Sequence, residues 1–218
     1  MVETIRGIVI ISLLLLINTT RAQRVIIYLH GQIVESQGPG AKDTVNGYGE
    51  YRYFDILDSL KGRGFTVLSE VRKKNTDPKD YAKKVVKQVD SLIKQGVPAS
   101  NITVVGASKG AVIAMLVSTL LSNNSVKYVF MGGCGSYLFT TYPEIKFHGE
   151  VLDVWEESDT DHSGPCDPIE IRAAPGEKYS IEILKTGLRH GFFYRPIREW
   201  LDPVTDHAKG EVNLGTQK

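Results

Sequence analysis

Short apolar segments rich in β-branched residues recur along this chain of 218 residues, and segments with helical periodicity separate them. The clearest apolar segment is Val25–Leu29, which is followed closely by Gly31. Continuous apolar runs of this length are typical of strands that are buried on both faces, as in parallel sheets covered by helices on both sides. The sequence therefore predicts an α/β protein, a three-layer α/β/α sandwich around a mostly parallel sheet of about six strands.

The other expected elements follow from periodicity and from glycine and proline stops. We expect helices near residues 53–62, 77–96, 109–121 and 196–202, and further strands near 66–72, 101–107, 126–133, 150–158 and 179–187. Residues 31–49 are polar and rich in glycine, so we expect a long loop there. It is the one segment of sufficient length to form a flap over a site.

The two ends of the chain differ in character from the middle. Residues 1–22 have a short charged start, an apolar core over 8–17 and a polar end at Ala22, which is the layout of a secretory signal peptide. The apolar core is shorter than the ~20 residues of a comfortable bilayer span. We expect a secreted or periplasmic domain over 23–218, with 203–218 as a loosely ordered tail, and the alternative is an uncleaved N-terminal membrane anchor.

Charge and cysteine content limit the classes of partner. The chain has 26 basic and 25 acidic residues, which gives no electrostatic reason to expect binding to nucleic acid. Cys134 and Cys166 are the only two cysteines, and in an oxidising compartment we expect a disulfide between them, the alternative being two free thiols. The cysteines and histidines lack the spacing of zinc ligands, so we expect no metal and no organic cofactor.

One motif predicts a nucleophile. Gly106-Ala107-Ser108-Lys109-Gly110 fits the pattern G-x-S-x-G and lies between an expected strand and an expected helix. A strand that turns directly into a helix forces the serine into a strained conformation and brings neighbouring backbone close, so that only glycine fits at Gly106 and Gly110. The hydroxyl of Ser108 is then exposed above the sheet. The alternative is a serine in an ordinary glycine-rich turn.

Backbone N–H groups beside this serine are candidates for an oxyanion hole. The N–H of Lys109 lies in the first turn of the helix, and the N–H of Gln32 follows the His30-Gly31 pair that ends the first strand. The Lys109 side chain has two interpretations, because a cation at this end opposes the helix dipole. It is either a solvated ammonium at the rim or a group that attracts an anionic part of the substrate.

A serine nucleophile needs a base within hydrogen-bond reach. His190 lies just past the end of a strand and is followed by a glycine, so a loop can place its imidazole over the sheet edge. His162, in another loop at that edge, is the alternative base. His148 precedes a strand and His207 lies in the C-terminal region, so we expect both far from the serine. We expect His30 to be a structural residue.

The third group must accept the second imidazole N–H and stabilise the imidazolium. Asp159 follows the expected strand over 150–158 and is the preferred candidate. With it, the order along the chain becomes serine, aspartate, histidine. The alternatives are Asp153, Glu156, Glu157 and Asp161.

Together these segments resemble the α/β-hydrolase superfamily. The resemblance rests on "YLHG" at 28–31, "GASKG" at 106–110, "ESD" at 157–159 and "LRHG" at 188–191. It implies a parallel-rich sheet, a Ser-His-acid triad and acyl-enzyme chemistry. We expect two departures from the family: no leading antiparallel hairpin, because the first strand already carries the His-Gly pair, and no cap, because the span between 133 and 150 is short. We therefore expect a small, lidless member that is similar to serine esterases and lipases.

The expected function is that of a secreted, carboxylesterase-like serine hydrolase acting on a small-molecule ester. Ser108 would attack the carbonyl, His190 would take and return the proton, and Asp159 would orient His190. Thioester or amide cleavage by the same three residues is one alternative. A binding protein that retains the scaffold without turnover is another.

Overall fold

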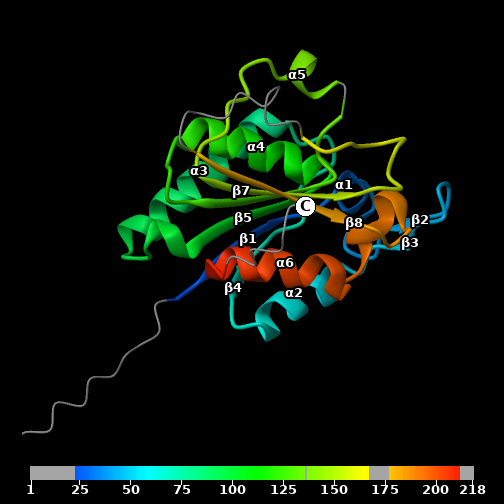
Figure 1. Cartoon of the computed structure of the whole chain (residues 1–218), viewed down its shortest axis with the longest axis horizontal. Helices are drawn as coiled ribbons and strands as arrows, with labels where there is room; N and C mark the ends of the chain where they lie inside the picture. Colours follow the sequence, from blue (N-terminus) through cyan, green and yellow to red (C-terminus); the bar gives the residue numbers. More distant parts are fainter. Residues whose placement is uncertain (1–22, 136, 167–176, 212–218) are drawn as a thin grey trace, which may run out of the picture.

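The computed structural model describes residues 23–135, 137–166 and 177–211, so the predicted signal peptide lies outside the described residues. Six parallel strands form the central sheet in the order β4-β1-β5-β6-β7-β8 (Figure 1). Their bounds are Val25–Leu29 for β1, Thr66–Leu68 for β4, Ile102–Ala107 for β5, Lys127–Met131 for β6, Glu150–Glu156 for β7 and Lys178–Leu184 for β8. The predicted fold class is confirmed.

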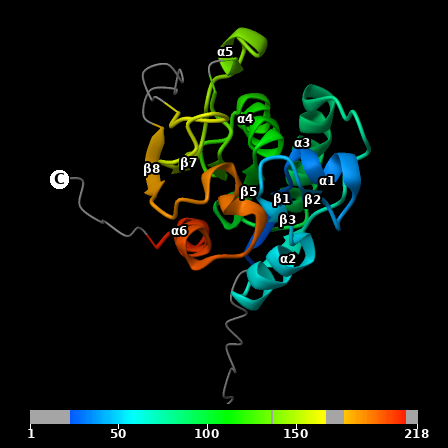
Figure 2. The same ribbon diagram turned by 90° about the vertical axis from the view of Figure 1, so that its right-hand side faces the viewer.

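Helices cover both faces of this sheet. Their bounds are Gln32–Gln37 for α1, Tyr53–Gly62 for α2, Pro78–Lys94 for α3, Lys109–Leu121 for α4, Leu138–Thr141 for α5 and Arg198–Lys209 for α6, with 3-10 turns at Ala99–Asn101 and Arg189–Tyr194. Helices α3 and α4 lie on one face, while α2 and α6 lie on the other (Figures 1 and 2). The chain thus forms the predicted three layers.

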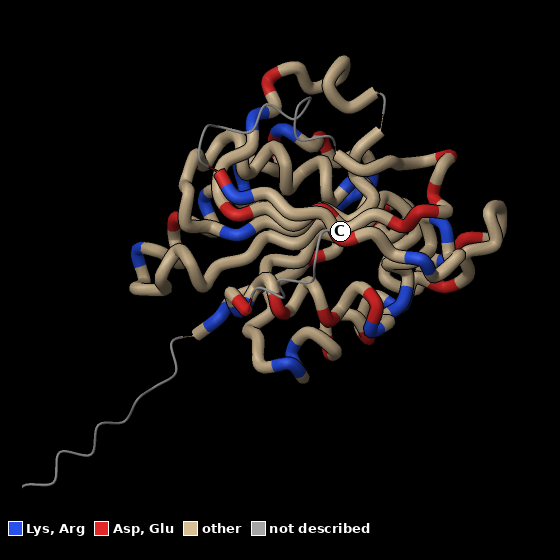
Figure 3. Tube along the Cα trace, viewed as in Figure 1, with Lys and Arg blue, Asp and Glu red and all other residues tan. Residues whose placement is uncertain are grey.

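A hydrophobic core lies on each face of the sheet, which explains why the strand sequences are apolar throughout. Side chains alternate across a strand. In β1, Val25, Ile27 and Leu29 pack with α3 and α4 in one core. Ile26 and Tyr28 pack with α2 and α6 in the other core. Along the Cα trace, Lys and Arg positions are mixed with Asp and Glu positions over much of the fold (Figure 3).

Local signals explain two of the helices. The Asp77 side chain accepts a hydrogen bond from the Asp80 N–H at 2.9 Å, and Pro78 occupies the first turn, so α3 begins where the sequence predicts. Helix α4 is apolar on nearly all sides, and its residues from Gly110 to Ser118 are buried. It is the central helix that follows Ser108.

The predicted long loop over residues 31–49 is wrong. This segment forms α1 and then a short antiparallel hairpin of β2 (Lys42–Asp43) and β3 (Gly49–Glu50). Val34 is buried against the core, and Glu35 is buried as well because cations from other parts of the chain pair with it. A polar composition therefore concealed a helix whose buried carboxylate is paired with cations from distant parts of the chain.

The predicted loose tail is wrong over residues 203–209, which continue α6, while 212–218 lie outside the described residues. Pro203 lacks the N–H that would bond to the preceding turn. Packing compensates for this loss, since Trp200, Val204 and Ala208 are buried on the sheet.

The structure contains the predicted disulfide between Cys134 and Cys166, whose Cα atoms are 5.3 Å apart. It joins the segment after β6 to the loop after β7. Between β6 and β7 the described residues include one helix, the four-residue α5, and no cap domain is seen among them. No helix in the described part of the chain combines the length and the apolar character needed to cross a bilayer.

Candidate active site

Ser108 occupies the sharp turn between β5 and α4. Its φ of 52° and ψ of −118° place it in a strained region that residues other than glycine rarely adopt. Its backbone N–H donates to the Met131 carbonyl at 2.8 Å, which fixes the turn to the neighbouring strand β6. The hydroxyl is therefore held at the carboxyl edge of the sheet, where ligands bind in open α/β sheets.

The two glycines of the motif allow helix and strands to approach closely. A Cβ at Gly106 would overlap the backbone of Gly110 and Ala111. A Cβ at Gly110 would overlap the carbonyl of Leu29 in β1. Either side chain would push α4 away from the sheet and move Ser108 with it.

The structure brings together Ser108 from the turn before α4, Asp159 from the loop after β7 and His190 from the 3-10 turn after β8. Ser108 Oγ lies 3.0 Å from His190 Nε2, and His190 Nδ1 lies 2.6 Å from Asp159 Oδ2. The Asp159 side chain is fully buried, and that of His190 is 12% exposed. A carboxylate accepts hydrogen bonds, so the Nδ1–H of His190 donates to Asp159, and its Nε2 faces the serine hydroxyl.

Glu156, one of the alternative acids, has a different position. Its buried carboxylate accepts hydrogen bonds from the N–H and hydroxyl of Thr186, the N–H of Gly187 and the hydroxyl of Ser158, at 2.7 to 3.1 Å. Burial would raise the pKa of Glu156, but these bonds more than offset that effect and lower it. Glu156 thus fixes the loop of His190 to the end of β7, a role that the sequence did not indicate.

The remaining alternative acids do not contact His190. Asp153 accepts from the Cys166 N–H at 2.7 Å and from the Tyr179 hydroxyl at 3.2 Å. Burial raises the pKa of Asp153 to about 7. Glu157 pairs with Lys185 at 3.6 Å, and Asp161 is exposed.

His162, the alternative base, lies beside His190. The two rings are stacked with centroids 4.9 Å apart and an angle of 24° between their planes. His162 Nδ1 is 3.4 Å from the Tyr48 hydroxyl and 3.7 Å from Asp159 Oδ1. In the described residues, the imidazole bonded to Ser108 is that of His190.

Two of the other three histidines, His148 and His207, lie at the far ends of the strands from Ser108, as the sequence predicts. His148 Nδ1 is 3.6 Å from Glu177, and His207 Nε2 is 3.2 Å from the carbonyl of Glu150, at the amino ends of the strands. His30 is fully buried and bonds to the backbone on both sides of its ring. Burial and the nearby Arg72 charge lower the pKa of His30 to about 4, so its ring is neutral.

A cavity of about 180 Å³ opens beside Ser108 and His190. Its lining includes Gly31 and Gln32 at the start of α1, and the aromatic side chains Tyr48, Phe193 and Tyr194. The first N–H groups of a helix lack intrahelical acceptors. Gln32 is the first residue of α1 and lines this cavity. Lys109 is the first residue of α4 and directly follows Ser108.

The first interpretation of the Lys109 side chain, a solvated ammonium at the rim, is wrong. The Lys109 side chain is only 17% exposed, and its Nζ lies 2.7 Å from Oε1 of the buried Glu35. The cation is thus already paired within the protein.

Across the described ranges, no group of three or more His, Cys, Asp or Glu side chains is arranged to hold a metal ion.

Comparisons with known proteins identify the fold. No protein-family model matches the chain, and no curated protein matches it in sequence. Many solved structures match in shape. They include one of two esterases from Rhizomucor miehei (TM-score 0.58, 15% identity, 88% of this chain and 77% of that one). A structure from the metagenome-derived lipolytic enzymes LipS and LipT matches with a TM-score of 0.56 at 10% identity, over 87% and 95% of the two chains.

An acetyl xylan esterase from Paenibacillus sp. R4 is a further match, with a TM-score of 0.52 and 12% identity, over 88% of this chain and 75% of that one. At these identities the likeness concerns the fold. The chain has the α/β-hydrolase fold, in a small form with no cap among the described residues.

Proposed function

We propose that this chain is a secreted serine hydrolase that cleaves a carboxylic ester through an acyl-enzyme on Ser108. The observation that supports this most strongly is the continuous hydrogen-bonded series from Ser108 Oγ through His190 to the buried Asp159. An imidazole placed between a hydroxyl and a buried carboxylate is the arrangement that activates a serine. The disulfide and the proposed signal peptide over residues 1–22 favour an exported protein.

In the first half-reaction, His190 Nε2 accepts the Ser108 proton as Oγ attacks the ester carbonyl. The Asp159 carboxylate accepts the Nδ1–H and stabilises the imidazolium that forms. The carbonyl oxygen becomes negatively charged in the tetrahedral intermediate, and the backbone N–H groups of Gln32 and Lys109 donate to it.

His190 then donates its proton to the leaving alcohol, and the ester bond breaks to leave the acyl group on Ser108. In the second half-reaction, water gives a proton to His190 and attacks the acyl carbonyl. Collapse of the second tetrahedral intermediate returns the proton to Ser108 Oγ and releases the acid.

The cavity beside Ser108 limits the acyl group that can bind. Its volume of about 180 Å³ is below the several hundred cubic ångströms that are typical of sites for larger ligands. The names of the structural neighbours refer to esterases and lipolytic enzymes, and one of them is an acetyl xylan esterase. An ester of a short carboxylic acid is therefore the substrate class that we propose.

We expect kcat/KM for p-nitrophenyl esters to be highest with acetyl to butyryl groups and to fall with octanoyl and longer groups. The reason is that longer chains exceed the cavity. A chain-length series under initial-rate conditions measures this dependence, and the thioester and anilide of the fastest acyl group test the two other substrate classes. A protein that hydrolyses none of the series would contradict the proposal.

A further inference from the structure

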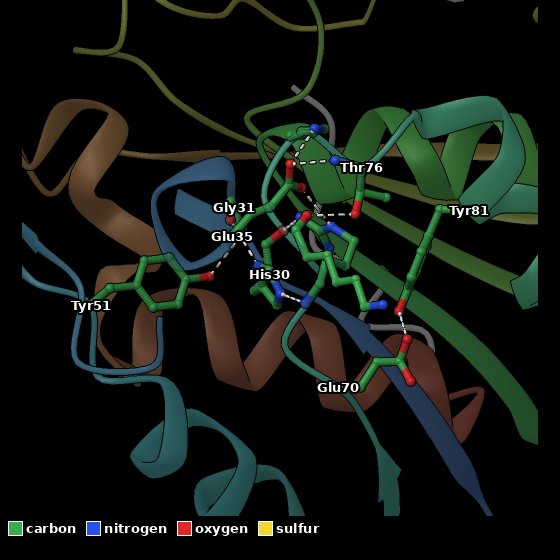
Figure 4. Close-up of polar contacts among 10 residues, drawn as sticks. His30, Gly31, Glu35, Tyr51, Glu70, Thr76 and Tyr81 are labelled. Atoms are coloured by element: carbon green, nitrogen blue, oxygen red, sulfur yellow. Dashed lines mark hydrogen bonds and ion pairs between the residues drawn. The ribbon is translucent and has the colours of Figure 1, made fainter. Parts of the chain in front are cut away.

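A buried carboxylate lies behind the two proposed oxyanion donors. Glu35 is on α1, three residues after Gln32, and its side chain is only 2% exposed. Its Oε1 accepts from Lys109 Nζ at 2.7 Å and from the Thr76 N–H at 3.0 Å, and its Oε2 accepts from Arg72 Nε at 3.1 Å (Figure 4). Burial would raise the pKa of Glu35, but the bonds and charges of Lys109 and Arg72 lower it, so the group is ionised at neutral pH.

The ion pair between Glu35 and Lys109 involves the residue that carries one of the two proposed oxyanion donors. Lys109 directly follows Ser108, and its backbone N–H is one proposed donor. Its side chain runs from that backbone to Glu35, so the ion pair ties the first residue of α4 to the middle of α1. A side chain held at its far end restricts the backbone to which it belongs.

The ion pair between Glu35 and Arg72 connects Glu35 to the backbone that precedes Gln32, whose N–H is the other proposed donor. The Arg72 side chain is fully buried, and its Nη2 donates to the His30 carbonyl at 2.5 Å. The Arg72 backbone N–H donates to His30 Nε2 at 3.0 Å, and His30 Nδ1–H donates to the Gly31 carbonyl at 2.8 Å. The Gly31 N–H reaches the Tyr51 hydroxyl at 3.4 Å (Figure 4). The two residues that precede Gln32 are thus held on several sides.

The charges in this cluster are costly for stability alone. Buried ion pairs contribute little compared with apolar residues of similar size, because both charges lose their hydration. The Lys109 cation also opposes the dipole at the start of α4. In addition, Arg72 Nη1 is buried and has no hydrogen-bond partner among the described residues. A cluster that costs this much, and that touches the residues on both sides of the proposed oxyanion hole, fits a role in placing those residues.

We infer that Glu35 is a positioning residue that sets the distance between the two oxyanion donors, by binding the Lys109 side chain directly and the His30-Gly31 backbone through Arg72. This inference rests on the proposed function. It also explains the lysine of the "GASKG" motif: the ammonium does not meet the substrate but holds its own N–H in place.

The test uses Lys109→Met, which removes the ammonium but keeps the backbone N–H and most of the side-chain volume, and Glu35→Gln, which removes the carboxylate charge. Loss of one oxyanion donor lowers kcat by about 10²- to 10³-fold, so we expect a misplaced donor to lower it by about 10- to 100-fold. KM for p-nitrophenyl acetate is expected to stay within about threefold, because the donors act mainly on the transition state.

Two further readouts separate positioning from a general loss of structure. Affinity for a trifluoromethyl ketone, whose serine adduct has a charged oxygen in the hole, is expected to fall by the same factor as kcat. The double variant is expected to lose no more than Glu35→Gln alone, because Lys109→Met removes one of the two ion pairs that Glu35→Gln weakens. Lys109→Arg retains the pair and is expected to keep kcat within about threefold of the wild type.

Arg63→Met is the matched control. It removes another partly buried pair, Arg63 with Asp202 at 2.6 Å, at the opposite edge of the sheet, and is expected to leave kcat unchanged. Wild-type kcat and ketone affinity in Lys109→Met would overturn the inference. If Glu35→Gln does not fold, Lys109→Met and Lys109→Arg still decide it. A wild type that neither hydrolyses esters nor reacts at Ser108 would instead overturn the proposed function, and the inference with it.

Discussion

Replacing Ser108 or His190 with alanine is expected to lower kcat for the best ester by about 10⁴- to 10⁶-fold, the range found when a residue of a serine triad is removed. The hydroxyl and the imidazole act as one unit across their 3.0 Å hydrogen bond. The double variant is therefore expected to lose no more than either single variant. Initial rates with each purified variant, corrected for spontaneous hydrolysis, measure the loss.

His162→Ala is the matched control, because His162 lies in the same cavity and stacks on His190 at 4.9 Å but is not bonded to Ser108. We expect it to lower kcat by less than about tenfold, since it removes packing and not the base. A large loss in His162→Ala together with a small loss in His190→Ala would assign the base to His162.

Removing the disulfide has the second large expected effect. The double variant Cys134→Ser/Cys166→Ser is expected to lose about 3–4 kcal/mol in the free energy of unfolding, the loop-closure estimate for a loop of roughly 30 residues. Urea unfolding followed by circular dichroism measures this change. An unfolding free energy within about 1 kcal/mol of the wild type would contradict the estimate.

Reduction is expected to lower activity before it unfolds the protein. The bridge constrains the loop after β7, in which the Ser163 hydroxyl bonds to Asp159 and the Gly164 N–H bonds to the Cys134 carbonyl at 2.8 Å. Loosening this loop frees the carboxylate that orients His190. Parallel ester assays and circular dichroism across a dithiothreitol series test the order of events. The variant without cysteines is the control, and unchanged activity with both thiols free would refute the expectation.

Most of the fold is predictable because its signals are local. The apolar strands are buried on both faces whatever their neighbours are, and the bounds of α4 follow from the glycine motif and the apolar run after it. The candidate residues Ser108, Asp159 and His190 are predictable from their places at strand ends, because the carboxyl ends of parallel strands meet at one edge.

What the sequence does not reveal depends on distant partners. Glu35 is buried only because Arg72 and Lys109, 37 and 74 residues away, neutralise it, so neither α1 nor the place of the Lys109 ammonium follows from local pattern. Likewise, the choice between His162 and His190 depends on which ring reaches Ser108, and both lie on loops at the same edge. The end of α6 depends on packing that outweighs Pro203.

The central claim is that Ser108 is a nucleophile activated by His190 and Asp159. Its most direct test is incubation of the folded protein with a fluorophosphonate, followed by mass spectrometry of the peptides. The account predicts one adduct, on Ser108, that forms within minutes in the wild type and is absent from Ser108→Ala and strongly slowed in His190→Ala. A folded wild-type protein that forms no adduct on Ser108 would contradict it.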